Sequence, residues 1–279
     1  MKVKAVRLHG ANDLRLDEFE LLEIKEDEIL VKVVSDSICM STYKCAILGT
    51  KHKRVHEDVA DHPAIMGHEM AGDIVKVGAK HQDKFKPGMK FTLQPALNYK
   101  GTMWSPGYSY EFFGGDATYC IIPAEVMELG CLLEYKGKAY YEASLAEPMS
   151  CSIGAFNAAY HTKMGVYTHV MGTTGGNTAD MIESLELTAQ GRINPAVMVT
   201  HIGGLDAAAE TTLNLPKIPG GKKLIYTHIS MPLIALEDLR SKEAQDSRYG
   251  KLADIVGANK GLWCPKAEEY LLSHFKEEA

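Results

Sequence analysis

The residues best suited to catalysis are one cysteine, one histidine and two glutamates, which occur at separate points of the sequence. They are Cys39, His68, Glu69 and Glu147. A thiolate, an imidazole and carboxylates form a ligand set that suits a zinc ion with one position left open for a substrate oxygen. Taken alone, a cysteine is more often a small buried hydrophobe and a histidine a hydrogen-bonded core residue. The combination, with Gly67 before His68 and Pro148 after Glu147, favours a metal centre.

Composition narrows the class of protein. The 279 residues are 46% hydrophobic and 24% charged, with a net charge of −6. These values are typical of a globular chain that forms one large or two modest domains. Proteins that bind nucleic acid usually carry a clustered basic excess, whereas the one basic run here, Lys51 to Arg54, is short. We therefore expect small-molecule chemistry and no nucleic-acid partner.

Cysteine usage and hydropathy bear on the compartment. The six cysteines are scattered without the dense spacing of a secreted disulfide scaffold. The segment Met1 to Val6 alternates like a strand and lacks the apolar region of a signal peptide, and no stretch is long enough to span a bilayer. We expect a cytoplasmic chain with reduced thiols and no membrane partner.

The elements that must position these residues change type along the chain. Up to about residue 130, short segments rich in β-formers alternate with Gly, Pro, Asn and Asp, which predicts an all-β barrel domain. The predicted strands are Lys2 to Leu8, Glu28 to Ser35, Ala71 to Val77, Lys90 to Leu93 and Thr118 to Pro123. The turn Lys86-Pro87-Gly88 joins two of them into a hairpin.

Helical patterns follow from Ala143. Ser144 to Tyr160 predicts one helix, and Asn177 or Thr178 caps a second helix that ends at Gly191. The remaining predicted elements are strands at Val197 to Thr200 and Lys222 to Tyr226, a short helix near Leu205 to Leu213, and helical pieces on the surface from Ser230. The predicted fold class is α+β, mainly β, with helices flanking the barrel.

Several motifs occur in an order that resembles one enzyme family. They are Met1 to Val6, Gly67-His68-Glu69, the hairpin from Ala71 to Gly88, Glu147-Pro148 and Gly221 to Ile225. In these motifs the chain resembles the zinc-dependent medium-chain dehydrogenase/reductase family, and within it the sorbitol dehydrogenase and L-sorbose-1-phosphate reductase-like proteins. The resemblance covers about residues 1 to 226. It implies a GroES-like, partly open barrel that carries the metal and an inserted Rossmann domain that carries NAD(P).

The inserted domain has no counterpart in this sequence. A Rossmann domain repeats βαβ units of roughly 30 residues that open with G-x-G-x-x-G. The stretch between the helix ending near Lys163 and Thr178 is too short for one unit, and Gly172 to Asn177 fits a linker and helix cap better than a phosphate cradle. We predict a first catalytic segment at 1–170, a junction at 171–177, a second segment at 178–279 and no cofactor-binding residues.

The resemblance assigns roles to the candidate ligands. Cys39 and His68 match the family's zinc ligands, and Glu69 is either a direct ligand or a neighbour that approaches the metal during exchange. Glu147 is a fourth ligand or holds the metal-bound water, with Cys151 a less favoured substitute. Zinc would lower the pKa of a bound alcohol or polarise a carbonyl.

Proton transfer is a further role that the resemblance assigns. Ser41 matches the family's relay hydroxyl, and a turn serine that bonds its own backbone is an equally good interpretation. Thr42 and Lys44 stand where the family often has an acid and a histidine, so the onward route is open.

The region from Pro95 to Phe112 contains no cysteine, so we predict one catalytic zinc and no structural zinc. Aromatic residues would hold this lobe instead, and Trp104 and Tyr110 either pack there or border a sugar pocket. A phosphate group on the substrate would meet Lys44, His52 or Lys53, unless these are solvated surface charges.

Two functions compete. The chain is either the catalytic half of a polyol or sugar-phosphate oxidoreductase, unable by itself to use NAD(P), or a non-redox metal-binding or interaction module that keeps the fold. In both cases, loss of a whole domain would expose apolar surface, which predicts a homo-oligomer through the open cleft face.

Overall fold

The structure is a computed structural model that describes residues 1–157 and 175–276. Most of the predicted junction at 171–177, and the end of the helix predicted from Ser144 to Tyr160, lie outside the described residues.

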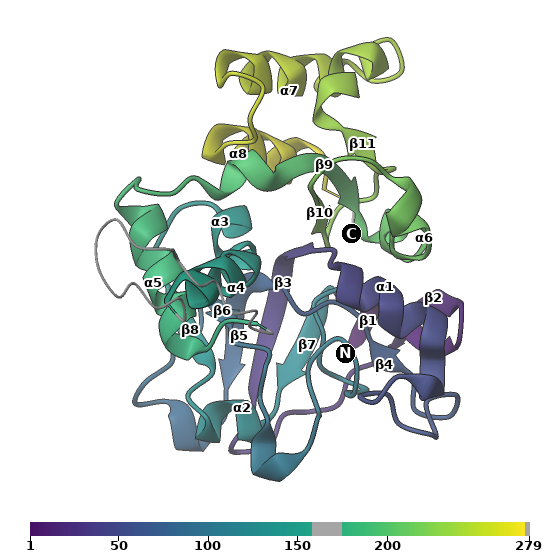
Figure 1. The fold of residues 1–279 in the computed structure, drawn as a ribbon, viewed down its shortest axis with the longest axis vertical. Helices are drawn as coiled ribbons and strands as arrows, with labels where there is room; N and C mark the ends of the chain where they lie inside the picture. Colours follow the sequence, from purple (N-terminus) through teal and green to yellow (C-terminus); the bar gives the residue numbers. More distant parts are fainter. Residues whose placement is uncertain (158–174, 277–279) are drawn as a thin grey trace, which may run out of the picture.

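Two sheets form the framework (Figure 1). The smaller sheet has the order β2-β1-β4, and the larger has the order β11-β9-β10-β3-β5-β6-β8, with β7 paired to β3. The strands are β1 (Lys2–Gly10), β2 (Asp13–Glu20), β3 (Ile29–Ser37), β4 (Ala64–Ile65), β5 (Ala71–Val77), β6 (Lys90–Leu93), β7 (Tyr119–Ile122), β8 (Leu132–Tyr135), β9 (Val199–Gly204), β10 (Lys222–Tyr226) and β11 (Ile234–Ala235). Each strand predicted from the sequence overlaps an observed strand, although Val197 and Met198 lie in a 3-10 turn before β9, and β2, β4, β8 and β11 are additional.

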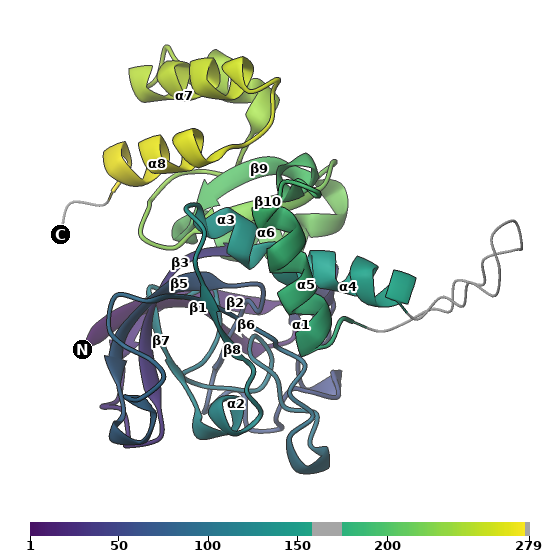
Figure 2. The same ribbon diagram turned by 90° about the vertical axis from the view of Figure 1, so that its left-hand side faces the viewer.

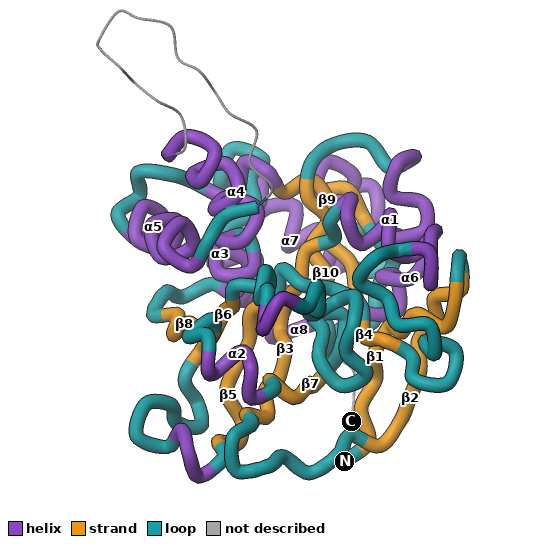
Figure 3. The backbone as a smooth tube through the Cα atoms, turned by 60° about the horizontal axis from the view of Figure 1, so that its bottom comes forward, coloured by secondary structure: helices purple, strands orange, loops and turns teal. Residues whose placement is uncertain are grey.

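The N-terminal strands curve around a buried core without closing among the described residues. Seen from below, the strands β6, β5, β3, β7 and β1 follow one another in an arc (Figure 3). Val31 and Val33 of β3 pack with Ile74 of β5 and Phe91 of β6 inside it. Gly72 permits the close pairing of β5 with β3, because a Cβ atom there would lie 1.9 Å from the carbonyl oxygen of Lys32. This arrangement agrees with the partly open barrel.

Helices flank this barrel and cover the C-terminal strands. They are α1 (Met40–Leu48), α2 (Ala124–Glu128), α3 (Tyr140–Ser144), α4 (Ala146–Asn157), α5 (Thr178–Ala189), α6 (Ala208–Asn214), α7 (Ser247–Ala258) and α8 (Pro265–His274). The helix predicted from Ser144 corresponds to α4, which begins at Ala146, and α3 is a separate short helix that ends at Ser144. Pro148 lies in the first turn of α4, where its missing N–H does no harm. Asn177 caps α5 as predicted, in a capping box with Asp180.

The C-terminal part builds a second core above the barrel. Parallel strands β9 and β10 are connected through α6, and α7 and α8 lie over them (Figure 2). Trp263 and Leu252 are fully buried there, so the tail is a core element and not the surface decoration that the sequence predicted. Its composition of mixed charge and Leu hid the apolar faces.

One carboxylate joins the tail to the rest of the chain. Glu268 of α8 accepts hydrogen bonds from the backbone N–H groups of Tyr140 and Tyr141 at 2.6 and 2.8 Å, and from the hydroxyl of Tyr226 at 2.9 Å. It thereby caps α3, which otherwise has no side-chain cap, from the other end of the chain. Because α3 leads into α4, the tail helps to place Glu147.

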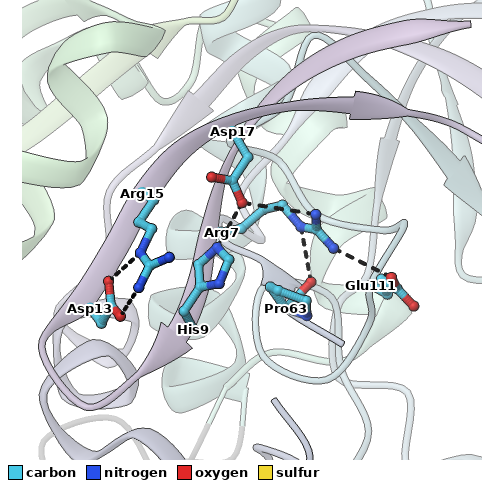
Figure 4. Close-up of polar contacts among 7 residues, drawn as sticks. All are labelled: Arg7, His9, Asp13, Arg15, Asp17, Pro63 and Glu111. Carbon is cyan, nitrogen blue, oxygen red and sulfur yellow. Dashed lines mark hydrogen bonds and ion pairs between the residues drawn. The ribbon is translucent and has the colours of Figure 1, made fainter. Parts of the chain in front are cut away.

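A polar cluster fixes the edge of the small sheet (Figure 4). Arg7 of β1 donates from Nε to the carbonyl oxygen of Pro63 at 3.1 Å and from a terminal nitrogen to Glu111 at 3.4 Å. Asp17 of β2 lies 2.7 Å from Nε2 of His9. These contacts anchor the end of the loop at 52–63, which borders the site described next.

Candidate metal centre

Three of the predicted ligands come together. Cys39 is the N-cap residue of α1, and His68 and Glu69 lie in the short connection between β4 and β5. One ligand atom from each lies within 4.8 Å of the others. His68 and Glu69 are buried, at 5% and 1% exposure. A half-buried thiol, a buried imidazole and a buried carboxylate at this spacing form a set that a zinc ion can bridge.

Gly67 makes this geometry possible. Its φ of 82° is one that side chains rarely adopt, and a Cβ atom there would lie 2.6 Å from both the backbone nitrogen of Asp116 and a carboxylate oxygen of Asp36. Only glycine therefore fits before His68.

The surroundings of His68 select one ring nitrogen. The hydroxyl of Thr42 lies 3.4 Å from Nδ1, and the ring of Tyr108 lies 5.2 Å away between centres. With Nδ1 facing Thr42, Nε2 is the nitrogen left to ligate a metal.

Glu69 is held by a residue that the sequence reading did not single out. Nζ of Lys222, at the start of β10, lies 2.5 Å from both carboxylate oxygens, and the hydroxyl of Ser37 donates to the same group. Burial disfavours the ammonium charge of Lys222, but Glu69 and Cys39 nevertheless hold its pKa above the usual value. The carboxylate of Glu69 would therefore contact both Lys222 and a bound metal ion. Two successive lysines opening an apolar strand are the sequence signal for this role.

Glu147 lies near the three ligands without joining the close group. It stands in the first turn of α4, and burial, followed by the charge of Glu69, raises its pKa to about 7. The thiol of Cys151, one turn later, donates to Glu147 at 3.7 Å. Cys151 thus contacts Glu147, and neither residue belongs to the close group of Cys39, His68 and Glu69.

Ser41 makes a contact that bears on its predicted relay role. Its hydroxyl donates to the sulfur of Cys39 at 3.0 Å and accepts from the hydroxyl of Tyr108 at 2.7 Å. The proton of Ser41 is thus directed at the thiol. Burial, followed by Glu69, raises the pKa of Cys39.

Two further acids lie behind the ligands and were missed by the sequence analysis. Asp36 and Asp116 are both fully buried, and their carboxylate oxygens have no hydrogen-bond partner among the described residues. Burial raises the pKa of Asp116 to about 7, and burial with the charges of Asp116 and Glu69 raises that of Asp36 well above its usual range. An aspartate inside the apolar run of β3 is the signal that could have revealed this pair.

The charges around the centre fit a bound cation. Four carboxyl groups, from Asp36, Glu69, Asp116 and Glu147, gather near one ammonium group, that of Lys222. Buried negative charge of this kind is unfavourable unless it is paired or binds metal. The ligand set and the surplus of carboxyl groups together fit a divalent ion.

The residues proposed to bind substrate are distributed unevenly around the centre. The ring of His52 stacks on that of Tyr108, 5.5 Å between centres, whereas Lys44 and Lys53 are exposed. Trp104 is 43% exposed and meets Tyr110 edge-on at 6.1 Å. The hydroxyl of Tyr110 donates to Glu125 at 2.9 Å. Within the described residues, His52 is thus joined to the centre through Tyr108, and the contacts of Trp104 and Tyr110 are those of packing.

Known proteins resemble this chain both in one domain and over nearly its whole length. Residues 25–135 match the family described as the alcohol dehydrogenase GroES-like domain. The chain is 36% identical to mannitol-1-phosphate 5-dehydrogenase of Aliivibrio fischeri over 408 aligned positions, covering 95% of this chain and 96% of that protein. It is 32% identical to L-sorbose 1-phosphate reductase of Klebsiella pneumoniae over 409 positions, covering 98% of each.

Solved structures share the fold. The structure of 2R,3R-butanediol dehydrogenase from Bacillus subtilis matches with a TM-score of 0.67 at 16% identity, over 81% of this chain and 99% of that chain. The GroES-like fold expected from the sequence is confirmed. No helix among the residues with described coordinates is both long and apolar enough to cross a membrane.

The alignments with the two relatives are longer than the chain itself. They run over 408 and 409 positions, whereas this chain has 279 residues, so well over a hundred positions of each relative face no residue here.

Proposed function

Because the chain belongs to the zinc-dependent medium-chain dehydrogenase/reductase family, we propose that it is the zinc-binding catalytic part of a polyol or sugar-phosphate oxidoreductase. The observation that carries the proposal is the group of half-buried Cys39 with buried His68 and Glu69, whose ligand atoms lie within 4.8 Å of one another. Glu147 completes the set as a fourth ligand or as the partner of a ligating water.

The chain's own residues would prepare this site for the reaction. Zinc, when bound, supplies a Lewis acid that polarises an alcohol or carbonyl oxygen. Lys222 restrains Glu69, and Thr42 orients the ring of His68. Ser41 directs its proton to the sulfur of Cys39, which favours the thiolate form that a metal requires.

We further propose that this chain does not bind NAD(P) by itself. The long gap in the alignments with full-length relatives supports an internal loss of the cofactor domain. A Rossmann domain repeats parallel βαβ units. The described residues contain one parallel pair, β9 with β10, and it belongs to the C-terminal core.

Metal analysis tests the first part of the proposal. The purified chain should hold one zinc ion, and Cys39→Ser should remove most of it. Cys264→Ser, which changes a cysteine that lies in the C-terminal core, is the matched control and should keep its zinc. Equal zinc in the wild-type chain and Cys39→Ser would contradict the assigned site.

Titration with NADH and NADPH tests the second part. No saturable change in nicotinamide fluorescence should appear at micromolar concentrations, before or after zinc is added. Saturable binding would show that a cofactor site remains.

We also propose that copies of the chain associate through the surface of α4 and α5. Phe156 of α4 is 68% exposed and Ile182 of α5 is 43% exposed, and the two helices pack together. An interface between copies would remove these two apolar side chains from water. Sedimentation should show a dimer or larger species, and Phe156→Glu should dissociate it.

A further inference from the structure

Arg54 stands apart from the other arginines of the chain. Arg7, Arg15, Arg240 and Arg248 each meet a carboxylate. Arg192 is exposed, whereas Arg54 is half-buried, and neither forms an ion pair within the described part of the chain. A half-buried guanidinium without an acid is costly to keep, unless something outside the chain supplies the anion.

Arg54 lies beside the metal centre. Its guanidinium carbon is 5.1 Å from the ring centre of Tyr108, the same ring that lies 5.2 Å from the ring of His68. The guanidinium and His68 are therefore separated by no more than twice the latter distance. The hydroxyl of Tyr108 leads through Ser41 to Cys39. One aromatic ring thus connects the cation with two metal ligands.

The backbone around Arg54 is fixed before any ligand arrives. The hydroxyl of Ser109 donates to the carbonyl oxygen of Arg54 at 2.7 Å, and the N–H of Arg54 donates to Nδ1 of His52 at 3.3 Å. The far end of the loop is anchored where Arg7 holds Pro63. The Arg54 side chain packs on an aromatic ring and its backbone is held by hydrogen bonds. It therefore loses little conformational entropy when it binds an anion.

The ionisable groups of this loop leave Arg54 as the half-buried cation that an anion would meet. Burial, together with the charges of Arg54 and Lys53, lowers the pKa of His52, so the imidazole is neutral at neutral pH and leaves the guanidinium as the partner. Glu57, Asp58 and Asp61 follow on the same loop, and none of them pairs with Arg54. A guanidinium offers two parallel N–H donors that match the oxygens of a phosphate.

We propose that Arg54 binds the phosphate group of a phosphorylated polyol or sugar and makes the metal centre selective for it over the free polyol. This inference rests on the function proposed above. With carbon–carbon bonds of about 1.5 Å, a six-carbon chain can place a hydroxyl at the metal ligands and a phosphate at Arg54. Lys44 and Lys53 are exposed and add only a favourable field.

Calorimetric binding to the zinc-loaded full chain tests the inference, with D-mannitol 1-phosphate, D-mannitol and inorganic phosphate as probes. The wild-type chain should bind mannitol 1-phosphate at least tenfold more tightly than mannitol. Arg54→Met should abolish that preference and leave the affinity for mannitol unchanged. Lys51→Met removes one positive charge from the same loop and is the matched control, with an expected change below threefold.

Arg54→Lys guards against an indirect effect on the packing of Tyr108. It keeps the charge and the aliphatic stem but not the two parallel donors, so its affinity for mannitol 1-phosphate should fall between those of the wild type and Arg54→Met. An unchanged preference in Arg54→Met, or an equal loss for both polyols, would overturn the inference. A wild-type chain that holds no zinc would contradict the proposed function instead, and one that binds zinc and both polyols equally would contradict this inference alone.

Discussion

The molecule contains two groups of buried acids that differ in their hydrogen bonding. Glu268, at 2% exposure in the C-terminal core, receives three hydrogen bonds from the groups around it. Asp36 and Asp116, at 0% exposure behind the candidate ligands, have carboxylate oxygens that no donor among the described residues meets in good hydrogen-bond geometry, and their polar contacts are with each other and with the backbone of Glu69. The fold itself satisfies the first acid and leaves the second pair unsatisfied.

The difference separates architecture from function. A buried carboxylate with donors in place contributes to folding, because its removal leaves those donors unpaired. A buried pair of carboxylates without donors destabilises the folded chain. A cation bound nearby would compensate their charge and account for their presence. The first kind holds the tail and α3 together, and the second kind lies where Cys39 and His68 also gather.

The largest expected effect comes from breaking the satisfied acid. Glu268→Ala should lower the free energy of unfolding by about 3 kcal/mol, because it leaves two N–H groups of α3 and the hydroxyl of Tyr226 without their acceptor. Urea denaturation of the metal-free chain measures this. Glu269→Gln, at the exposed neighbouring position, is the control and should change stability by less than about 0.5 kcal/mol.

The pH dependence of stability should differ between the two groups once zinc is added. Burial raises the pKa of both Glu268 and Asp116 to about 7, whereas such acids titrate near ~4 in an unfolded chain. Between those values the folded chain keeps protons that the unfolded chain has lost. The free energy of unfolding of the metal-free chain should therefore fall as pH rises, by about 3 kcal/mol between pH 5 and pH 8 for each independent acid.

Saturating zinc should remove the part of this slope that arises at the metal centre and leave the part due to Glu268. The zinc-loaded chain should then lose stability across the same pH range only through Glu268. Glu268→Gln in the zinc-loaded chain should abolish that remaining loss. An identical slope with and without zinc would count against a cation at the centre.

Neutralising one member of the unsatisfied pair should have the opposite sign to Glu268→Ala. Asp116→Asn should stabilise the metal-free chain at pH 8 by about 2 kcal/mol, because it removes a buried charge that repels Asp36. With zinc bound the gain should shrink. If Asp116→Asn destabilises the metal-free chain, the Asp116 carboxylate has a stabilising partner in the fold, and the contrast with Glu268 does not hold.

The smallest expected effect concerns the hydrogen bonds that reach Cys39. Tyr108→Phe removes the donor to Ser41, and it should weaken Co²⁺ binding about tenfold and shift the thiolate-to-cobalt absorption band. Tyr135→Phe removes a hydroxyl that donates to Glu142 and is the control. Equal cobalt spectra for the two variants would mean that Tyr108 only packs against His68.

Much of the N-terminal fold could be predicted because its signals are local. The alternation of β5 and the turn at Gly88 define a hairpin without reference to the rest of the chain. β2 was missed because its pattern of charged residues is that of an exposed strand, and its pairing with β1 is what stabilises it. The buried tail was missed because the apolar positions of α7, such as Leu252 and Val256, stand among charged and small residues that are typical of a surface helix.

The site divides in the same way. Cys39, His68 and Glu69 were predictable because their residue types are scarce and suited to metal. Lys222, Asp36, Asp116 and Arg54 were not, because lysine, aspartate and arginine are common surface residues. Their role at the site depends on which charged and hydrogen-bonding groups lie beside them in the folded chain.

The sequence by itself determined the family, the barrel and three candidate ligands that the fold brings together, because these depend on short motifs in a fixed order. Only the tertiary structure decided that Lys222 competes for Glu69, that two acids stand unpaired behind it and that Arg54 lies without an acid beside Tyr108. The physical reason is that the free energy of a charge depends on its burial and its neighbours, and residues far apart in the chain supply both.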